Sequence, residues 1–137
     1  MHPNDHYEFD YRVVAGDSAR LLCQAQGDDF PDVLATSRMI GLMELAAARL
    51  MRPELQAGEL SVGVSLDVTH QAATPLFETI RVRATRDGRE GKLYRFRVEV
   101  RDEGGIVGSG THLRAIVRQE RLIENARRRI DTARASG

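Results

Sequence analysis

The sequence predicts an α+β fold in which one long central helix is wrapped by a curved antiparallel sheet. Three observations lead to this prediction: one apolar segment of helical length at residues 32–51, four alternating apolar and polar segments after it, and a further strand-like segment at residues 7–14. A lone helix and an antiparallel sheet each have an apolar face to bury, so packing one on the other satisfies both. The 137 residues fit a single domain of this kind.

The chain before the helix contains one clear strand and one weaker candidate. Residues 7–14 (YEFDYRVV) alternate aromatic or apolar residues with polar ones, and Ala15-Gly16-Asp17 then supplies a turn. Residues 18–25 (SARLLCQA) are a weaker strand candidate, and the stretch QGDDFP that follows breaks the chain.

The long helix is predicted from about Asp32 to Met51. This segment is rich in Leu, Met and Ala, and Pro53 stops it. The helix is apolar around most of its circumference, whereas a sheet covers only one side of a helix. We therefore expect a second covering surface, most simply another copy of the chain in a homodimer.

Four alternating segments after the helix predict four consecutive antiparallel strands. In residues 61–70 one face holds Val62, Val64, Leu66, Val68 and His70. Residues 79–86 and 92–102 are predicted to form a hairpin around Asp87-Gly88. Its inward side chains are Ile80, Val82, Ala84, Tyr94, Phe96, Val98 and Val100.

The last predicted strand, residues 106–118, can face the core with Val107, Leu113, Ala115 and Val117. This places His112 and Arg114 on the opposite face, where a solvated or dimer-facing surface is the favoured interpretation. From about residue 119 the chain is helix-permissive but strongly charged, with a thin apolar stripe of Leu122, Ile123 and Ile130, so an exposed C-terminal helix is expected.

The composition excludes several classes of function. Twenty basic and twenty acidic residues leave no net charge, so the electrostatic footprint of a nucleic-acid-binding protein is missing. No apolar run is long enough for a membrane span, and the start of the chain lacks the pattern of a secretory signal, so a cytoplasmic protein is expected. Cys23 is a single cysteine and is interpreted as a small core residue. No metal-ligand cluster, phosphate loop or dinucleotide fingerprint is present, so we expect a reaction without cofactors.

Glu44 is the one carboxylate in the apolar helix segment. Burial of an ionised carboxylate is unfavourable unless it is paired or takes up a proton. No lysine or arginine lies at helical spacing from it, and its neighbours there are mostly small: Ile40, Gly41, Ala47 and Ala48. Glu44 is therefore either a functional acid or an edge residue that is exposed or paired with Arg38 or Arg49.

Two further residue types give this acid possible partners. His70 ends the inward row of its strand and can reach an interior carboxylate, or it can bond a backbone carbonyl as a structural histidine. Thr36, with Ser37, stands at the start of the helix, where a hydroxyl either caps the helix or helps to polarise a substrate carbonyl. Gly63 is either a simple bend or a position where a ligand can approach the strand.

The segments FPDVLATSRMIGLMELAAARLM, SVGVSLDVTHQAATP and GSGTHLRAIV together resemble the hotdog-fold thioesterase family that includes the fluoroacetyl-CoA thioesterases. The resemblance runs from about Phe30 to Val117. Its specific element is the combination of a threonine at the helix start, a glutamate eight residues later within GLME, and a histidine at the end of a VTH strand. The resemblance implies a hotdog fold, a homodimer, and a catalytic set of Thr36, Glu44 and His70.

The resemblance also implies the activity, which is hydrolysis of an acyl-CoA thioester without a metal. Glu44 would attack the carbonyl or activate water, His70 would orient the acid and carry a proton, and Thr36 would hold the carbonyl oxygen. Substrate contacts are expected from Phe30, Gly63 and Arg114, the last at a CoA phosphate. The stretch QAQGDDFP offers only Phe30 for an aromatic lid, so a small or short-chain acyl-CoA is expected rather than fluoroacetyl-CoA alone. The main alternative is a non-catalytic hotdog module that binds an acyl ligand, and a hotdog hydratase is less favoured.

Overall fold

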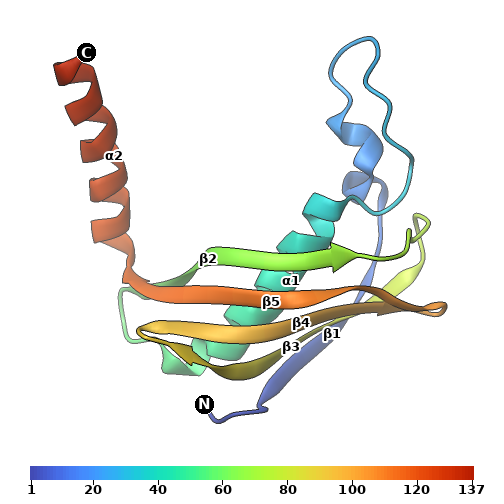
Figure 1. The fold of residues 1–137 in the computed structure, drawn as a ribbon, viewed down its shortest axis with the longest axis horizontal. Coiled ribbons are helices and arrows are strands. Elements are labelled where there is room, and N and C mark those ends of the chain that lie inside the picture. The colour runs from blue at the N-terminus through green and yellow to red at the C-terminus, as the bar shows by residue number, and fades with distance from the viewer.

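The computed structural model describes residues 1–137 and shows one long helix packed against a five-stranded antiparallel sheet (Figure 1). The strands are β1 (His6–Arg12), β2 (Glu59–His70), β3 (Thr79–Glu90), β4 (Leu93–Asp102) and β5 (Gly105–Arg118), in the order β1-β3-β4-β5-β2. The helices are α1 (Thr36–Met51) and α2 (Gln119–Ser136). The predicted α+β class is confirmed.

The core lies between α1 and the inward face of the sheet. The side chains that α1 buries recur at helical spacing and form one stripe: Met39, Leu42, Met43, Ala46, Ala47 and Met51. The inward row of the β3–β4 hairpin is buried as its alternation predicts, with Ile80, Val82, Ala84, Tyr94, Phe96, Val98 and Val100 all in the core. Each large apolar side chain buried here stabilises the fold by roughly 1.5–3 kcal/mol.

A bulge in β2 changes which residues face the helix. The register with β5 shifts between Gly63 and Ser65, so Val64 is an extra residue, and it is 52% exposed. Gly63 pairs with buried Arg114 and therefore faces α1, whereas Val62 on the other face does not. The prediction that Val62 and Val64 point inward is wrong for this reason; His70, beyond the bulge, does lie on the helix side.

A second bulge has the same effect on β5. The register with β4 shifts between Val100 and Arg101, which leaves Val107 as the extra residue. Beyond it the alternation is out of phase with the sequence-based prediction, so His112 and Arg114 face α1 and are buried. Their predicted place on a solvated or dimer-facing surface is wrong.

The segment between β1 and α1 is not a strand. In place of the weaker predicted strand at residues 18–25, the chain forms 3₁₀ turns at Ala15–Asp17 and Ala19–Leu22. It then runs irregularly to α1, which begins at Thr36 rather than near the predicted Asp32. Cys23, predicted to be a core residue, is half-buried here. In Figure 1 this segment rises beyond the start of the helix.

Asp17 anchors that segment to the start of α1. Its carboxylate is buried and accepts hydrogen bonds from the Tyr11 hydroxyl, the Val14 N–H and Nε of Arg38, each at 2.8 Å. Its backbone carbonyl accepts from the Ala35 N–H at 2.8 Å. Burial alone would raise the pKa of Asp17, but the bonds from Val14, Tyr11 and Arg38 outweigh it, and the pKa is lowered.

Several surfaces of the fold have no partner within the chain. Strand β2 is at the edge of the sheet, and Gly41 and Leu45 are exposed on the side of α1 away from the core. Helix α2 projects away from the body and buries none of its residues (Figure 1), as expected for the charged C-terminal segment. Neither helix is long and apolar enough to cross a membrane.

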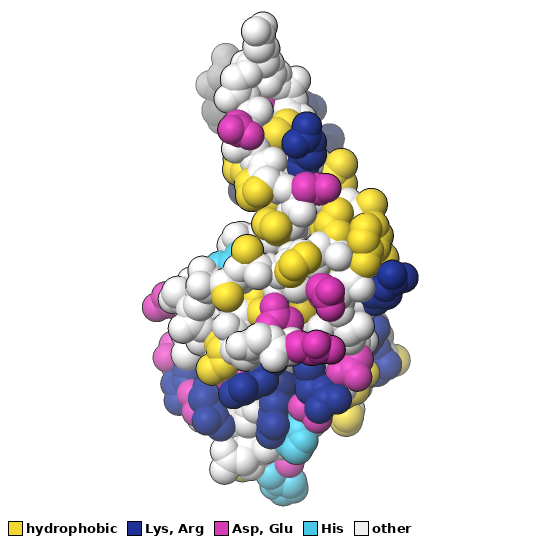
Figure 2. All heavy atoms as spheres, turned by 90° about the vertical axis from the view of Figure 1, so that its right-hand side faces the viewer, with side chains coloured by type: hydrophobic (Ala, Val, Ile, Leu, Met, Phe, Trp, Pro, Cys, Tyr) yellow, Lys and Arg dark blue, Asp and Glu magenta, His cyan; other side chains and the backbone are white.

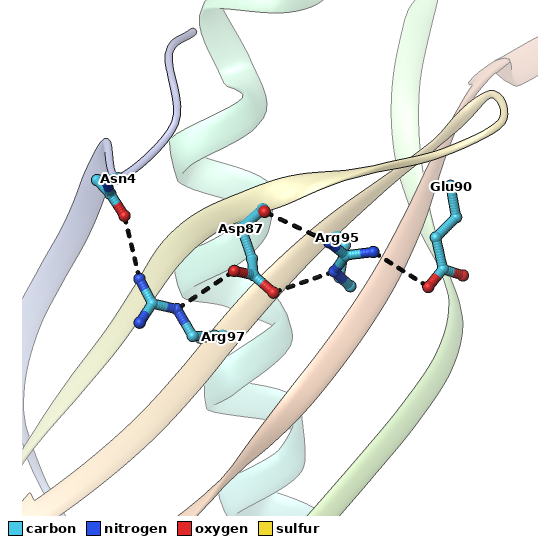
Figure 3. A network of polar contacts seen from close by, with 5 residues as sticks. All are labelled: Asn4, Asp87, Glu90, Arg95 and Arg97. Atoms are coloured by element: carbon cyan, nitrogen blue, oxygen red, sulfur yellow. Dashed lines mark hydrogen bonds and ion pairs between the residues drawn. The ribbon is translucent and has the colours of Figure 1, made fainter.

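The outward side of the sheet carries charged side chains. Figure 3 shows Arg95 of β4 paired with Asp87 at 3.0 Å and with Glu90 at 3.2 Å, while Arg97 reaches Asp87 and donates to Asn4. In Figure 2 basic side chains form a band across the lower part of the molecule, and apolar side chains gather higher up. Exposed pairs of this kind contribute about 0–1 kcal/mol each to stability, so they act mainly to keep this face solvated.

Candidate active site

The first turn of α1 and the last residue of β2 meet at the candidate site. Thr36 is the first residue of α1, but Ala35 is the N-cap and no side chain caps the helix. The Thr36 hydroxyl instead lies 2.7 Å from Nδ1 of His70. Nε2 of His70 is buried and has no hydrogen-bond partner. One ring nitrogen of the imidazole is therefore without a partner within the chain.

The start of α1 also offers backbone donors. The Met39 N–H bonds the Ala35 carbonyl, the first bond of the helical pattern. The N–H groups of residues 36–38 therefore have no acceptor within the helix. Together with the positive end of the helix dipole, they form a place where a developing negative charge on an oxygen is stabilised.

A small pocket opens beside the Thr36–His70 pair. Its volume is about 300 Å³, and six of its ten lining residues are hydrophobic. The lining includes Phe30, Val33, Leu34, Ala72 and Ala73 beside Thr36 and His70. Phe30 lies at the edge of the pocket and is 42% exposed. The pocket is at the small end of the range for ligand sites.

Glu44 lies two turns further along α1, with a different partner. Its Oε2 is 3.0 Å from Nη1 of Arg114, and its side chain is 39% exposed. The alternatives with helix arginines do not occur, because Arg38 pairs with Asp17 and Arg49 lies over the ring of Phe9 at 5.0 Å. Glu44 is thus a half-exposed acid held by a cation from the sheet.

Gly63 provides the space that this carboxylate occupies. A Cβ at Gly63 would overlap Oε2 of Glu44 and would lie 3.3 Å from Cε1 of His112. Gly63 is therefore neither a mere bend nor open space for a ligand within this chain. The Glu44 carboxylate is itself the group that lies close to the strand backbone at Gly63.

Arg114 lies beneath the helix, and hydrogen bonds to several groups hold its guanidinium. Besides Glu44, its guanidinium donates to the Ser61 hydroxyl at 3.0 Å, the Ser61 carbonyl at 2.8 Å and Nε2 of His112 at 3.0 Å. Arg114 is 5% exposed. Burial lowers its pKa, and the bond to Glu44 opposes that effect. This placement contradicts a contact with a CoA phosphate.

The structure thus brings the predicted catalytic residues together as two groups. Thr36 and His70 form one group, and Glu44 with Arg114 and Gly63 forms the other. Eight helical residues separate Thr36 from Glu44, a rise of about 12 Å, too long for one hydrogen-bonded cluster within a chain. From sequence, Arg114 is predicted to have another role and His112 is not a candidate, because the bulge at Val107 hides their inward orientation.

The fold and these two groups define a class of protein. A long helix wrapped by an antiparallel sheet is the hotdog architecture, and a hydroxyl–imidazole pair at the helix start with an acid on the same helix is a set of groups suited to acyl transfer.

Comparisons with known proteins identify the family. The family model described as fluoroacetyl-CoA-specific thioesterase (FlK) matches residues 17–120, and the chain belongs to this family. A fluoroacetyl-CoA thioesterase of Streptantibioticus cattleyicolor is 43% identical over 131 residues, which cover 94% of each chain.

Solved structures agree with this assignment. A solved structure of the fluoroacetyl-CoA thioesterase FlK is 37% identical and has a TM-score of 0.87, and the match covers 93% of this chain and 96% of that one. A threonine-to-serine variant of FlK in complex with acetyl-CoA has a TM-score of 0.88 at 36% identity, covering 94% and 98% of the two chains. The predicted hotdog fold and family resemblance are confirmed.

Proposed function

We propose that this protein hydrolyses a small or short-chain acyl-CoA thioester to the free acid and CoA. The observation that carries the proposal is the 2.7 Å contact between Thr36 and His70 at a small apolar pocket, in a chain that belongs to a thioesterase family. The pocket is mostly apolar and has a volume of about 300 Å³, so it can accept an acyl group. Relatives that act on fluoroacetyl-CoA or bind acetyl-CoA support this size class.

The residues of the first group fit the transition state of thioester cleavage. The thioester carbonyl oxygen would lie against the Thr36 hydroxyl and the free N–H groups of residues 36–38, which stabilise the oxyanion. His70 would move a proton to the departing thiolate through Nε2, its unpartnered nitrogen. Removing one such donor in an acyl-transfer enzyme commonly costs about 10²–10³-fold in rate.

Glu44 would supply the base or the nucleophile. As a base it takes a proton from water that attacks the carbonyl carbon, and as a nucleophile it forms an anhydride that water then opens. Both routes end with an acid and a thiol. The ion pair with Arg114 orients the carboxylate in either case.

A homodimer would bring the two groups together. The edge strand β2 and the exposed side of α1, with Gly41 and Leu45, are continuous open surfaces that a second copy can cover. In a two-fold dimer through these surfaces, Glu44 of one copy approaches the Thr36–His70 pair of the other. The half-exposed side chain of Glu44 leaves it accessible for this role.

Mixing of inactive variants tests both the residues and the dimer. If the site is shared, Thr36→Ala refolded with an equal amount of Glu44→Ala regains about a quarter of wild-type activity, because half of the dimers are mixed and each has one intact site. Thr36→Ala mixed with His70→Ala is the matched control and stays inactive, since both residues come from the same chain. No recovery in the first mixture would contradict a shared site.

The activity itself is tested by thiol release across acyl-CoA chain lengths. We expect the highest kcat/KM for short acyl groups, because relatives act on fluoroacetyl-CoA or bind acetyl-CoA. If no thioester is cleaved while acyl-CoA still raises the melting temperature, the protein is a binding module instead.

A further inference from the structure

A buried polar chain runs beneath α1 and ends at Glu44. His112 is fully buried, although it is titratable and has no role in the chemistry proposed above. Its Nδ1 lies 2.8 Å from the Ser65 carbonyl of β2, and its Nε2 lies 3.0 Å from Nη1 of Arg114. The same Nη1 is 3.0 Å from Oε2 of Glu44. An interior polar group is tolerated only when its hydrogen bonds are made, and here both ring nitrogens have partners.

The partners determine the protonation state of His112. A carbonyl oxygen only accepts hydrogen bonds, so Nδ1 carries the proton and donates to Ser65. A guanidinium only donates, so Nε2 accepts from Arg114. Burial lowers the pKa of His112, and the charge of Arg114 lowers it further, while Ser65 and Glu44 act in the opposite direction. The ring is therefore neutral, in one tautomer.

The neutral ring holds the arginine in a single orientation. Nε and Nη2 of Arg114 donate hydrogen bonds to the hydroxyl and the carbonyl of Ser61, and Nη1 donates one to Nε2 of His112. The charged groups that face His112 are Glu44 of α1 and Arg114 of β5. The ring of Phe96 of β4 is a further, uncharged neighbour, 6.5 Å away between centroids. A proton on Nε2 would place two N–H groups against each other and break the bond to Arg114.

We propose that His112 is a positioning residue that aims the Glu44 carboxylate through Arg114. The imidazole directs the guanidinium, and the guanidinium holds Oε2 of Glu44 in the space left open by Gly63. This inference rests on the proposed role of Glu44 in thioester hydrolysis. Small losses of alignment in such groups reduce kcat by up to about 10²-fold, so a fixed arginine matters for rate.

Two substitutions separate positioning from packing. His112→Gln keeps an acceptor for Arg114 and a donor for Ser65, whereas His112→Leu keeps apolar volume and makes neither bond. We expect kcat to fall about 10–100-fold in His112→Leu with KM changed less than about twofold, and to stay within about threefold of wild type in His112→Gln. In a Glu44→Gln background His112→Leu should add less than about a twofold loss, because the two changes act through one group.

The pH profile and a crystal structure supply further readouts. Wild-type kcat should show an ionisation below pH 6.5, the ordinary pKa of histidine, that is missing in His112→Gln. In crystals of His112→Leu the Glu44 carboxylate should leave its place beside Gly63.

A Glu44 carboxylate that stays beside Gly63 in His112→Leu overturns the inference. Equal losses of kcat in His112→Leu and His112→Gln, at equal thermal stability, overturn it as well. If wild type cleaves no thioester, the proposed function fails, and the crystal structures still decide whether His112 positions Glu44. Should His112→Leu not fold, an unchanged pH profile in His112→Gln overturns the inference.

Discussion

The hydroxyl of Thr36 lies 2.7 Å from Nδ1 of His70, which joins the first turn of α1 to the last residue of β2. Thr36 does not cap the helix with this hydroxyl, and His70 does not use this nitrogen to bond a backbone carbonyl. Those are the structural roles that the sequence allows for the two residues. The first N–H groups of α1 and the buried Nε2 of His70 have no partner within the chain, and both Thr36 and His70 line the pocket. These unpaired polar groups are the candidates for catalysis at the start of α1.

The first prediction concerns the Thr36 hydroxyl. Thr36→Val, which has the same shape without the hydroxyl, should lower kcat/KM by about 10²-fold if the hydroxyl stabilises the oxyanion. Thr36 is exposed, so the melting temperature should change little. Steady-state kinetics with a short acyl-CoA measures the effect. Thr36→Ser keeps the oxygen and is the control; a Val variant as active as the Ser variant would contradict the role.

The second prediction concerns the space at Gly63. A Cβ there overlaps the Glu44 carboxylate, so Gly63→Ala should push the acid out of alignment and lower kcat by roughly 10-fold or more. Gly16→Ala is the matched control, because a Cβ at Gly16 meets nothing within 4 Å. Kinetics and thermal unfolding of both variants provide the measurement. Unchanged kcat in Gly63→Ala would show that the position of the carboxylate is not critical.

The third prediction concerns the dimer. Val64 is 52% exposed on the edge strand β2, and a charged side chain at an edge opposes pairing with another strand. Val64→Lys should therefore give a monomer by size-exclusion chromatography with light scattering, and thioesterase activity should be lost with the shared site. Ile123→Lys, at a 60% exposed position of α2, is the control and should leave both properties unchanged. A dimeric, active Val64→Lys protein would place the interface elsewhere.

The fourth prediction concerns stability in acid. The pKa of Asp17 is lowered in the folded protein, so its contribution to stability is present above its ordinary pKa of 3.8 and is lost as pH falls through the folded value. Asp17→Asn should lower the free energy of unfolding at pH 7 by about 1–3 kcal/mol, because buried hydrogen bonds to a charged acceptor are weakened. Urea unfolding at pH 7 and at pH 3 should show a difference between the two proteins that shrinks in acid. A constant difference would mean that the charge of Asp17 is not what stabilises the start of α1.

Alternation and length were sufficient to predict the parts of the fold that follow one regular period. The α1 segment has a regular pattern, and so have residues 79–86 and 93–102 of the β3–β4 hairpin, whose inward residues are buried. The turn predicted at Asp87-Gly88 is wrong, because β3 continues through a bulge there to Glu90. Thr36 and His70 contact each other in the structure, and each stands at the end of a segment that the sequence predicts, Thr36 at the start of α1 and His70 at the end of β2.

The errors arise where one extra residue breaks the period. Bulges at Val64 and Val107 exchange the two faces of β2 and β5, so Val62 was assigned to the wrong side and Arg114 to the surface. A bulge depends on how two distant strands fit together, and local alternation carries little information about it. The 3₁₀ turns at residues 15–22 depend likewise on the buried carboxylate of Asp17, whose partners Tyr11 and Arg38 lie in other elements.

The close fit of Glu44 against Gly63 also constrains how the gene can change. A side chain at position 63 is compatible with the fold only if the acid at position 44 is shortened or turned away, and glutamate in its present orientation is compatible only with glycine opposite it. Because either adjustment would misplace the acid, a substitution at position 63 is expected to lower activity even when position 44 keeps its glutamate. The two codons, far apart along the chain, are expected to evolve as one unit.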